Sequence, residues 1–171
     1  MIISERKLKE LDSLLKREEK DDISNAVEVL REEEPFSGAI SLLTSLYDKS
    51  DDTLVKKSIE KFMNDLKDQT ACEEVVTELK KPWKPSTISM LVSSCWQSGL
   101  DYSEFSLYFT ELFVKTDYIT AIECLTVIEE AVHYLTKEKK SEIIKYIQDN
   151  YLTNPDEKRE LTIELMSILK G

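Results

Sequence analysis

The first residue that could carry chemistry is His133, the single histidine of the chain. Glu129 and Glu130 precede it by four and three residues in EEAVHYL, so on a helix all three side chains share one face. A Glu and a His in this arrangement can move protons or bind a metal, but the zinc-protease pattern requires a second His four residues away. Because the chain lacks that second His, we expect His133 to be a surface residue paired with its neighbouring carboxylates.

The three cysteines could supply a nucleophile or metal ligands. Cys72, Cys95 and Cys124 are separated by 23 and 29 residues, whereas zinc sites take at least two ligands from closely spaced positions. Cys95 and Cys124 fall on the apolar stripes of helical segments, and His133 is nine residues from Cys124, off its helix face. We therefore expect buried, reduced thiols in a reducing compartment rather than thiol catalysis.

Paired carboxylates occur in REEEP, KSDD and IEEA, at predicted helix ends and polar faces where both acids stay solvated. The segment NPDEKRE begins like a calcium loop but lacks the central Gly and the final Glu. The sequence contains no P-loop, no G-x-G-x-x-G and no G-x-S-x-G. We therefore expect a protein that is not an enzyme and that needs no cofactor and no metal.

The composition favours an all-α fold. Of the 171 residues, 41% are hydrophobic and 33% are charged, but only three are Gly and four are Pro. Hairpin turns and phosphate-binding loops need glycine where the backbone turns sharply, so its scarcity argues against β and α/β folds. The chain is long enough to bury a substantial core in a single domain.

The net charge of −11 narrows the possible partners. Such a chain repels nucleic-acid phosphates and anionic membrane surfaces, so we expect neither as a partner. No stretch approaches 18 uncharged apolar residues, and the N-terminal MIISERKLKELDSLL lacks the apolar core of a signal peptide. We therefore expect a cytoplasmic protein.

The apolar residues recur with a helical period along nearly the whole chain. Predicted N-caps are Ser50, Thr136 and Asn154, and Asp101 with Glu104 forms a capping box in DYSE. The ten predicted helices cover about residues 4–19, 22–33, 35–47, 50–66, 70–80, 86–99, 103–115, 117–134, 137–151 and 155–169.

The predicted third, fifth, seventh and ninth helices begin near residues 35, 70, 103 and 137, at intervals of about 35, 33 and 34 residues. A steady period of this size is typical of stacked helical hairpins. Over residues 35–170 the chain resembles the HEAT/armadillo class of helical repeat proteins, by this period and not by a consensus motif. The resemblance implies an α-α superhelix with a curved groove that binds proteins. Residues 1–34 would be charged N-terminal capping helices and residues 35–171 about four hairpins, within one domain; the alternative is an irregular multi-helix bundle.

The stretch SSCWQSGLDYSEFSLYF lies in the most aromatic part of the chain. Residues 82–134 hold nine of the fourteen aromatic residues, with two basic residues against seven acidic ones. Helical spacing predicts that part of this set is core, namely Trp96, Phe105, Tyr108, Phe109 and Phe113. Trp83, Tyr102 and Tyr118 fall instead at turns or helix starts, where Trp and Tyr are typical of binding hot spots.

We therefore predict a protein-interaction module whose partner carries basic and apolar groups. Its candidate binding residues are Trp83, Tyr118 and Tyr102, with the acidic neighbours Glu111, Asp117 and Glu123. In a regular stack Trp83 and Tyr118 would lie on one edge and Tyr102 on the opposite edge. Two alternatives are a regulatory bundle that binds a small ligand among the sixth, seventh and eighth helices, and an acidic nucleic-acid mimic.

Overall fold

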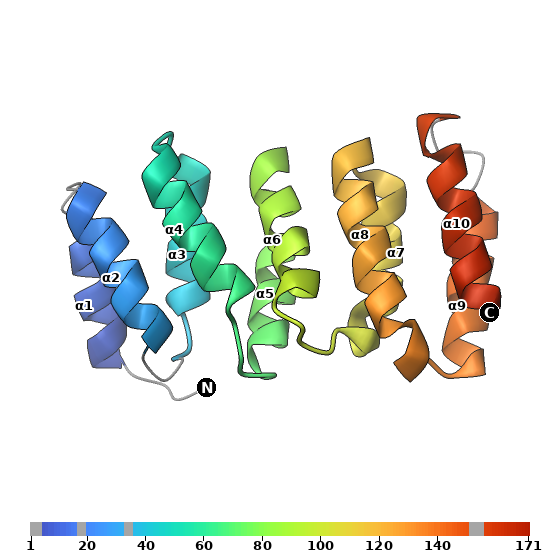
Figure 1. Ribbon diagram of the computed structural model, residues 1–171, viewed down its shortest axis with the longest axis horizontal. Coiled ribbons are helices and arrows are strands. Elements are labelled where there is room, and N and C mark those ends of the chain that lie inside the picture. Colours follow the sequence, from blue (N-terminus) through green and yellow to red (C-terminus); the bar gives the residue numbers. More distant parts are fainter. Residues whose placement is uncertain (1–4, 17–19, 33–35, 151–155) are drawn as a thin grey trace. The chain divides into compact units, whose positions relative to one another are not determined.

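The structure is a computed structural model that describes residues 5–16, 20–32, 36–150 and 156–171 (Figure 1). Its regular elements in these residues are α-helices and short 3₁₀ turns, which confirms the predicted all-α class. The chain divides into two compact units, residues 1–100 and 101–171. The prediction that they form one domain stays a prediction, and each unit is described by itself.

The described part of the first unit contains three consecutive helix pairs. Within each pair the two helices pack on each other, α1 on α2, α3 on α4 and α5 on α6. The pairs also stack, because α1 packs on α3 and α3 on α5, while α2 packs on α4 and α4 on α6. The helices are α1 (Glu5–Leu15), α2 (Lys20–Glu32), α3 (Ala39–Lys49), α4 (Thr53–Asn64), α5 (Ala71–Leu79) and α6 (Pro85–Gln97).

The second unit repeats this arrangement with two helix pairs. In the pairs α7 packs on α8 and α9 on α10, and between the pairs α7 packs on α9 and α8 on α10. Figure 1 shows α8 and α10 in front of α7 and α9. The helices are α7 (Ser106–Lys115), α8 (Tyr118–Ala131), α9 (Lys137–Asn150) and α10 (Arg159–Lys170), with 3₁₀ turns η1 (Ser103–Phe105), η2 (Val132–Tyr134) and η4 (Asp156–Lys158).

The start of α4 follows the local capping rules, but through a different residue from the predicted one. The N-cap of α4 is Asp52, whose carboxylate accepts hydrogen bonds from the N–H groups of Leu54 and Val55 at 2.9 and 3.2 Å. The predicted cap Ser50 was wrong: its hydroxyl accepts from the N–H of Asp52 at 3.1 Å, and its own backbone caps the end of α3. Asp52 is two positions nearer the helix than Ser50, and its carboxylate acts as the N-cap.

The predicted caps Asp101 and Thr136 both accept backbone hydrogen bonds. Asp101 Oδ1 accepts from the N–H of Ser103 at 2.8 Å, and this bond starts the 3₁₀ turn η1, so that α7 begins at Ser106. Thr136 Oγ1 accepts from the N–H of Lys139 at 3.3 Å. The predicted helix start at Pro35 and the predicted cap Asn154 lie outside the described residues.

Contacts between stacked hairpins of the first unit fix both ends of α3. At its N-terminal end, Glu74 Oε1 on α5 accepts from the N–H of Gly38 at 2.9 Å. At its C-terminal end, Asp48 Oδ1 accepts from the N–H of Lys84 at 2.9 Å and from the hydroxyl of Thr87 at 2.8 Å. Burial raises the pKa of Glu74, and the N–H of Gly38 acts against that rise by stabilising the carboxylate.

In the second unit a buried lysine donates hydrogen bonds to the carbonyls at the C-terminal end of α7. The ammonium of Lys158, which is 0% exposed, donates to the carbonyl oxygens of Phe113, Val114 and Thr116 at 2.8, 2.8 and 2.7 Å. These carbonyls belong to the last turn of the helix or follow it, where the helix dipole favours a cation. Lys158 therefore satisfies several backbone acceptors at once.

The aromatic core of the second unit centres on Phe109 and Phe113, both fully buried as predicted. The predicted core residues Phe105 and Tyr108 are only half-buried. In the first unit Trp96 is 37% exposed, so its predicted place in the core was wrong. Trp96 lies about 100° around α6 from the fully buried Cys95 and thus at the edge of the buried stripe.

Candidate functional site

In the second unit, the first half of α8 exposes several large apolar side chains. Ile119 is 66% exposed, Tyr118 41% and Ile122 38%. Ile119 and Ile122 are three residues apart and share one side of the helix, and Glu129 and Glu130 follow on that side near its end. We call these five residues the α8 surface.

The charge of the α8 surface has one sign. The helix sequence YITAIECLTVIEEA contains no Lys or Arg, and both carboxylates of the α8 surface are exposed. Glu129 and Glu130 lie in the last turn, where the negative end of the helix dipole disfavours an anion by about 0.3–1 kcal/mol each. A cation placed beside them by another molecule would relieve this repulsion.

The start of α8 is fixed by Asp117, one of the predicted binding residues. Its carboxylate accepts from the N–H of Thr120 at 3.0 Å and from the Thr120 hydroxyl at 3.1 Å. The hydrogen bond from the Thr120 N–H is the main cause of the lowered pKa of Asp117. This carboxylate therefore stays ionised at a lower pH than an ordinary aspartate. Asp117 therefore adds a permanent negative charge beside Tyr118, while its side chain is occupied as the N-cap.

The three predicted aromatic binding residues have three different environments. Tyr118 is exposed, as predicted. Trp83 is half-buried, and its indole N–H donates to the carbonyl of Glu78 at 3.0 Å, so the ring is fixed to the end of α5. The predicted exposure of Tyr102 was wrong: it is 2% exposed, and its ring meets that of Phe109 edge-on at 5.8 Å.

The predicted acidic neighbours all lie in the second unit. Glu111 is half-buried and pairs with Lys115 at 3.1 Å, one turn away on α7. Glu123 is half-buried on α8. Because Trp83 belongs to the first unit and Tyr118 to the second, the predicted edge that joins them stays a prediction.

The predicted core stripe of α8 missed part of this site. It included Ile122, which is exposed, whereas Ala121, Cys124, Leu125 and Ile128 are buried. The first half of α8 is apolar on nearly every side, so a helical period alone does not indicate which side faces the core. The sequence did contain one indication of an exposed apolar surface, because the first half of α8 has more apolar residues than one buried face requires.

The remaining candidate chemistry lies outside this surface. His133 is exposed in η2, as predicted, and the three cysteines are buried free thiols. The described residues contain no group of three or more His, Cys, Asp and Glu side chains placed to hold a metal ion. Among the helices of the described ranges, none has the length and apolar character needed to cross a membrane.

The buried thiols allow a direct test of the core. Cys95 and Cys124 are both 0% exposed, and burial raises the pKa of Cys124 despite the nearby charge of Lys158. We expect both to react slowly with a thiol reagent in the folded protein and rapidly in denaturant, because the thiolate is the reactive form. Mass spectrometry after timed labelling measures this for each cysteine. Rapid labelling of Cys124 under native conditions would show that its part of the core is open.

Comparison with known proteins identifies no family for this fold. No protein-family model matches the chain, and no curated protein or solved structure matches it at a significant level. The resemblance to HEAT/armadillo repeats therefore stays a prediction from the helical period.

Proposed function

We propose that this protein is a non-enzymatic protein-interaction module of the helical-repeat type, and that its α8 surface binds the partner. The observation that carries this proposal is the exposure of Tyr118, Ile119 and Ile122 on a helix without any basic residue. Clustered apolar side chains in water favour association, and Tyr is among the residue types enriched at hot spots. The partner contributes an apolar contact and basic side chains.

The end of α8 and the net charge of the second unit both support a basic partner. Glu129 and Glu130 lie at the end of the helix where its dipole already carries negative partial charge. The second unit contains fourteen acidic and eight basic residues, a net charge of 8 − 14 = −6. Such a field accelerates the encounter with a positively charged surface and repels polyanions.

The stacking of hairpins within each unit supports the repeat class. First helices pack on first helices and second helices on second helices, which is how helical-hairpin repeats bury their apolar faces. Stacked second helices such as α8 and α10 then form a continuous face that can receive a partner. The ligand-binding bundle and the acidic mimic are the competing functions that an experiment must separate.

A photo-crosslinking amino acid at Ile119 tests the proposal in the native cell. We expect it to capture a discrete protein partner, because this side chain is 66% exposed at the centre of the apolar part of the α8 surface. The matched control is the same crosslinker at Leu54, an aliphatic residue of α4 with 62% exposure. Equal capture of the same protein at both positions, or capture of nucleic acid at Ile119, would contradict the proposal.

Binding to the purified partner then tests the named residues. We expect Tyr118→Ala with Ile122→Ala to weaken binding by about tenfold or more, because clustered apolar anchors supply most of the binding energy. Glu129→Lys with Glu130→Lys should slow association and reduce its dependence on salt. Leu54→Ala, on α4 of the first unit, is the control for loss of an exposed aliphatic residue. Undiminished affinity in the Tyr118 and Ile122 double variant would place the interface elsewhere.

A further inference from the structure

The exposed side of α8 carries residues at the spacing that one helix presents to another. At intervals of three, four and three residues these are Ile119, Ile122, Thr126 and Glu129, and Glu130 follows directly. On a helix the five positions fall within an arc of about 100°, so they form one strip along α8. The strip joins the aliphatic and the acidic parts of the α8 surface, with Thr126 between them.

The opposite side of α8 packs within its own unit. Its buried residues are Ala121, Cys124, Leu125, Val127 and Ile128, and the helix packs on α7 and α10. The strip lies outside this buried arc, since Ile119 and Ile122 are 66% and 38% exposed. Residues three and four apart form the ridges through which two helices pack. The strip therefore has the pattern of a helix–helix contact, and its aliphatic part is exposed.

The backbone of a bound segment must also find hydrogen-bond partners. The N–H and C=O groups in the middle of α8 are already bonded within the helix. The hydroxyl of Thr126 donates to the carbonyl of Ile122 at 3.2 Å and is occupied as well. An extended segment laid over Ile119 and Ile122 would bury backbone groups that this surface cannot satisfy, whereas a helix satisfies its own. The surface therefore favours a helical occupant.

The acidic end of the strip determines where the charges of the partner lie. Glu129 and Glu130 are exposed in the last turn of α8, seven to eleven residues beyond Ile122 and Ile119. At 1.5 Å per residue the acidic and aliphatic parts are about 10–16 Å apart along the axis. A partner that contacts both parts needs its apolar and basic side chains at the same separation, which is about two to three helical turns.

We propose that the partner segment is an amphipathic helix that lies along α8, with apolar residues facing Ile119 and Ile122 and with Lys or Arg residues facing Glu129 and Glu130. This inference rests on the function proposed above and adds the conformation and the residue spacing of the bound segment. The helix presents its apolar residues three or four positions apart and its basic residues two to three turns away on the same face. Its basic side chains also relieve the repulsion between the two carboxylates and the negative end of α8.

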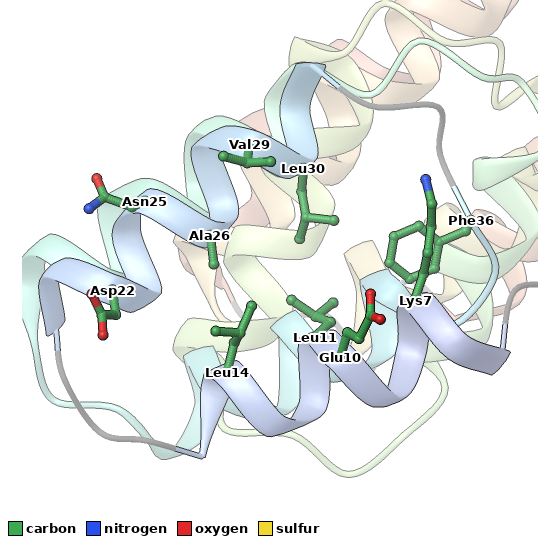
Figure 2. Close-up of a pocket in the computed structure, with 10 residues that line it drawn as sticks. All are labelled: Lys7, Glu10, Leu11, Leu14, Asp22, Asn25, Ala26, Val29, Leu30 and Phe36. Carbon is green, nitrogen blue, oxygen red and sulfur yellow. The ribbon is translucent and has the colours of Figure 1, made fainter.

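The apolar groove between α1 and α2 in the first unit does not match this partner. Figure 2 shows side chains of the two helices pointing toward one another across the groove, with Lys7 and Glu10 at one end and Asp22 at the other. These charges have both signs, so the groove presents no acidic cluster beside its apolar residues. Val29, which lines the groove and is 58% exposed, is therefore a control position for an exposed aliphatic residue.

Two photo-crosslinking positions measure the conformation of the bound segment. Ile119 and Glu130 are eleven residues apart and lie within about 20° of each other around α8. Mass spectrometry of the crosslinks formed in the native cell identifies the partner residue that each position contacts. We expect the two partner residues to be about eleven positions apart, because neighbouring helices have the same rise per residue. An extended segment would advance by only about five positions over the same length of about 16 Å.

The inference and the proposed function fail by different results. Capture of a protein whose two crosslinked residues are about five positions apart would overturn the helical segment but leave the α8 surface as the binding site. Capture of no protein from either Ile119 or Glu130 would overturn the proposed function and the inference together. Equal capture of the same partner segment from Val29 would overturn its assignment to α8.

Charge exchange tests the predicted pairing with Glu129 and Glu130. The crosslinked segment, made as a synthetic peptide with its Lys and Arg residues replaced by Glu, should bind the wild type at least about tenfold more weakly than the natural peptide. Glu129→Lys with Glu130→Lys should restore its binding to within a few-fold. These changes place cations at the end of α8, where the helix dipole favours them, so we expect the fold to be retained, as circular dichroism would show.

The matched control for charge exchange is Glu142→Lys with Glu160→Lys. Both glutamates are exposed in the second unit, on α9 and α10, and the double variant changes the net charge by the same amount. We expect it to leave the acidic peptide bound as weakly as the wild type does. Equal restoration by both double variants would overturn the pairing, because only the net charge would then matter. Failure of Glu129→Lys with Glu130→Lys to restore binding would also overturn it.

Discussion

Replacing Phe109 by alanine is expected to lower the free energy of unfolding by about 3–5 kcal/mol. The side chain is 0% exposed at the centre of the second unit. Its ring meets Tyr102 edge-on at 5.8 Å and Tyr108 at 6.0 Å. The substitution removes these aromatic contacts and leaves a cavity that the surrounding helices can only partly fill, and both effects destabilise the fold. Urea denaturation followed by circular dichroism measures the change.

Tyr134→Ala is the matched control for Phe109→Ala. It also removes an aromatic ring from the second unit, but Tyr134 is 69% exposed in η2. Exposed positions of this kind change stability by about 0.5 kcal/mol or less. A loss below about 1 kcal/mol for Phe109→Ala would mean that α7 is not packed as described.

The second large effect concerns Lys158, where substitution by methionine should cost about 3 kcal/mol or more. Methionine keeps much of the length and apolar volume of the side chain but has no donor. The carbonyls of Phe113, Val114 and Thr116 would then lose the ammonium that they share at 2.7–2.8 Å. Buried acceptors left unsatisfied cost far more than the same groups in water.

The pH dependence of the free energy of unfolding tests whether the loss in Lys158→Met comes from a buried ionisable group. Burial lowers the pKa of Lys158 below its ordinary value of 10.5, so the folded chain releases this proton at a lower pH than the unfolded chain. Between the two pKa values the unfolded chain binds more protons, and the contribution of Lys158 to the free energy of unfolding therefore rises with pH. The wild type should become more stable relative to Lys158→Met as the pH increases through that window.

Lys145→Met is the control for Lys158→Met. Lys145 is exposed on α9, so its replacement should change stability by no more than about 0.5 kcal/mol. Equal losses for Lys158→Met and Lys145→Met would contradict the role of Lys158 at the end of α7.

The sequence was sufficient for features that depend on residues close together in the chain. The helical period places Phe109 and Phe113 on one buried face, and Thr136 and Asp101 accept the backbone bonds that short-range rules predict. Even there, the N-cap of α4 is Asp52 and not the predicted Ser50, because both residue types can cap a helix and the carboxylate of Asp52 is the one that reaches the first N–H groups of the helix.

Features that depend on tertiary packing could not be predicted in the same way. Tyr102 follows a turn, and turns are usually exposed, but its ring folds back onto Phe109. Ile122 and Trp96 fit apolar stripes that are wider than the faces the neighbours cover.

Lys158 was also unpredictable from spacing. It lies 45 residues beyond Phe113, in a charged segment where a lysine is ordinarily exposed. Its partners are backbone carbonyls, which every residue possesses, so no side-chain pattern marks the contact. Only the packing of α7 with the following hairpin brings the ammonium to the end of that helix.

The contacts that complete helix ends have a consequence for synthesis on the ribosome. Glu74 is made 36 residues after Gly38, Lys84 is made 36 residues after Asp48, and Lys158 is made 45 residues after Phe113. Glu74 and Lys158 bond to backbone groups at an end of the earlier helix, and the ammonium of Lys84 donates to the backbone carbonyl of Asp48 near the end of α3. A newly made hairpin therefore leaves the ribosome with an end still bonded to water, and it reaches its final stability only when the next hairpin has emerged and docked.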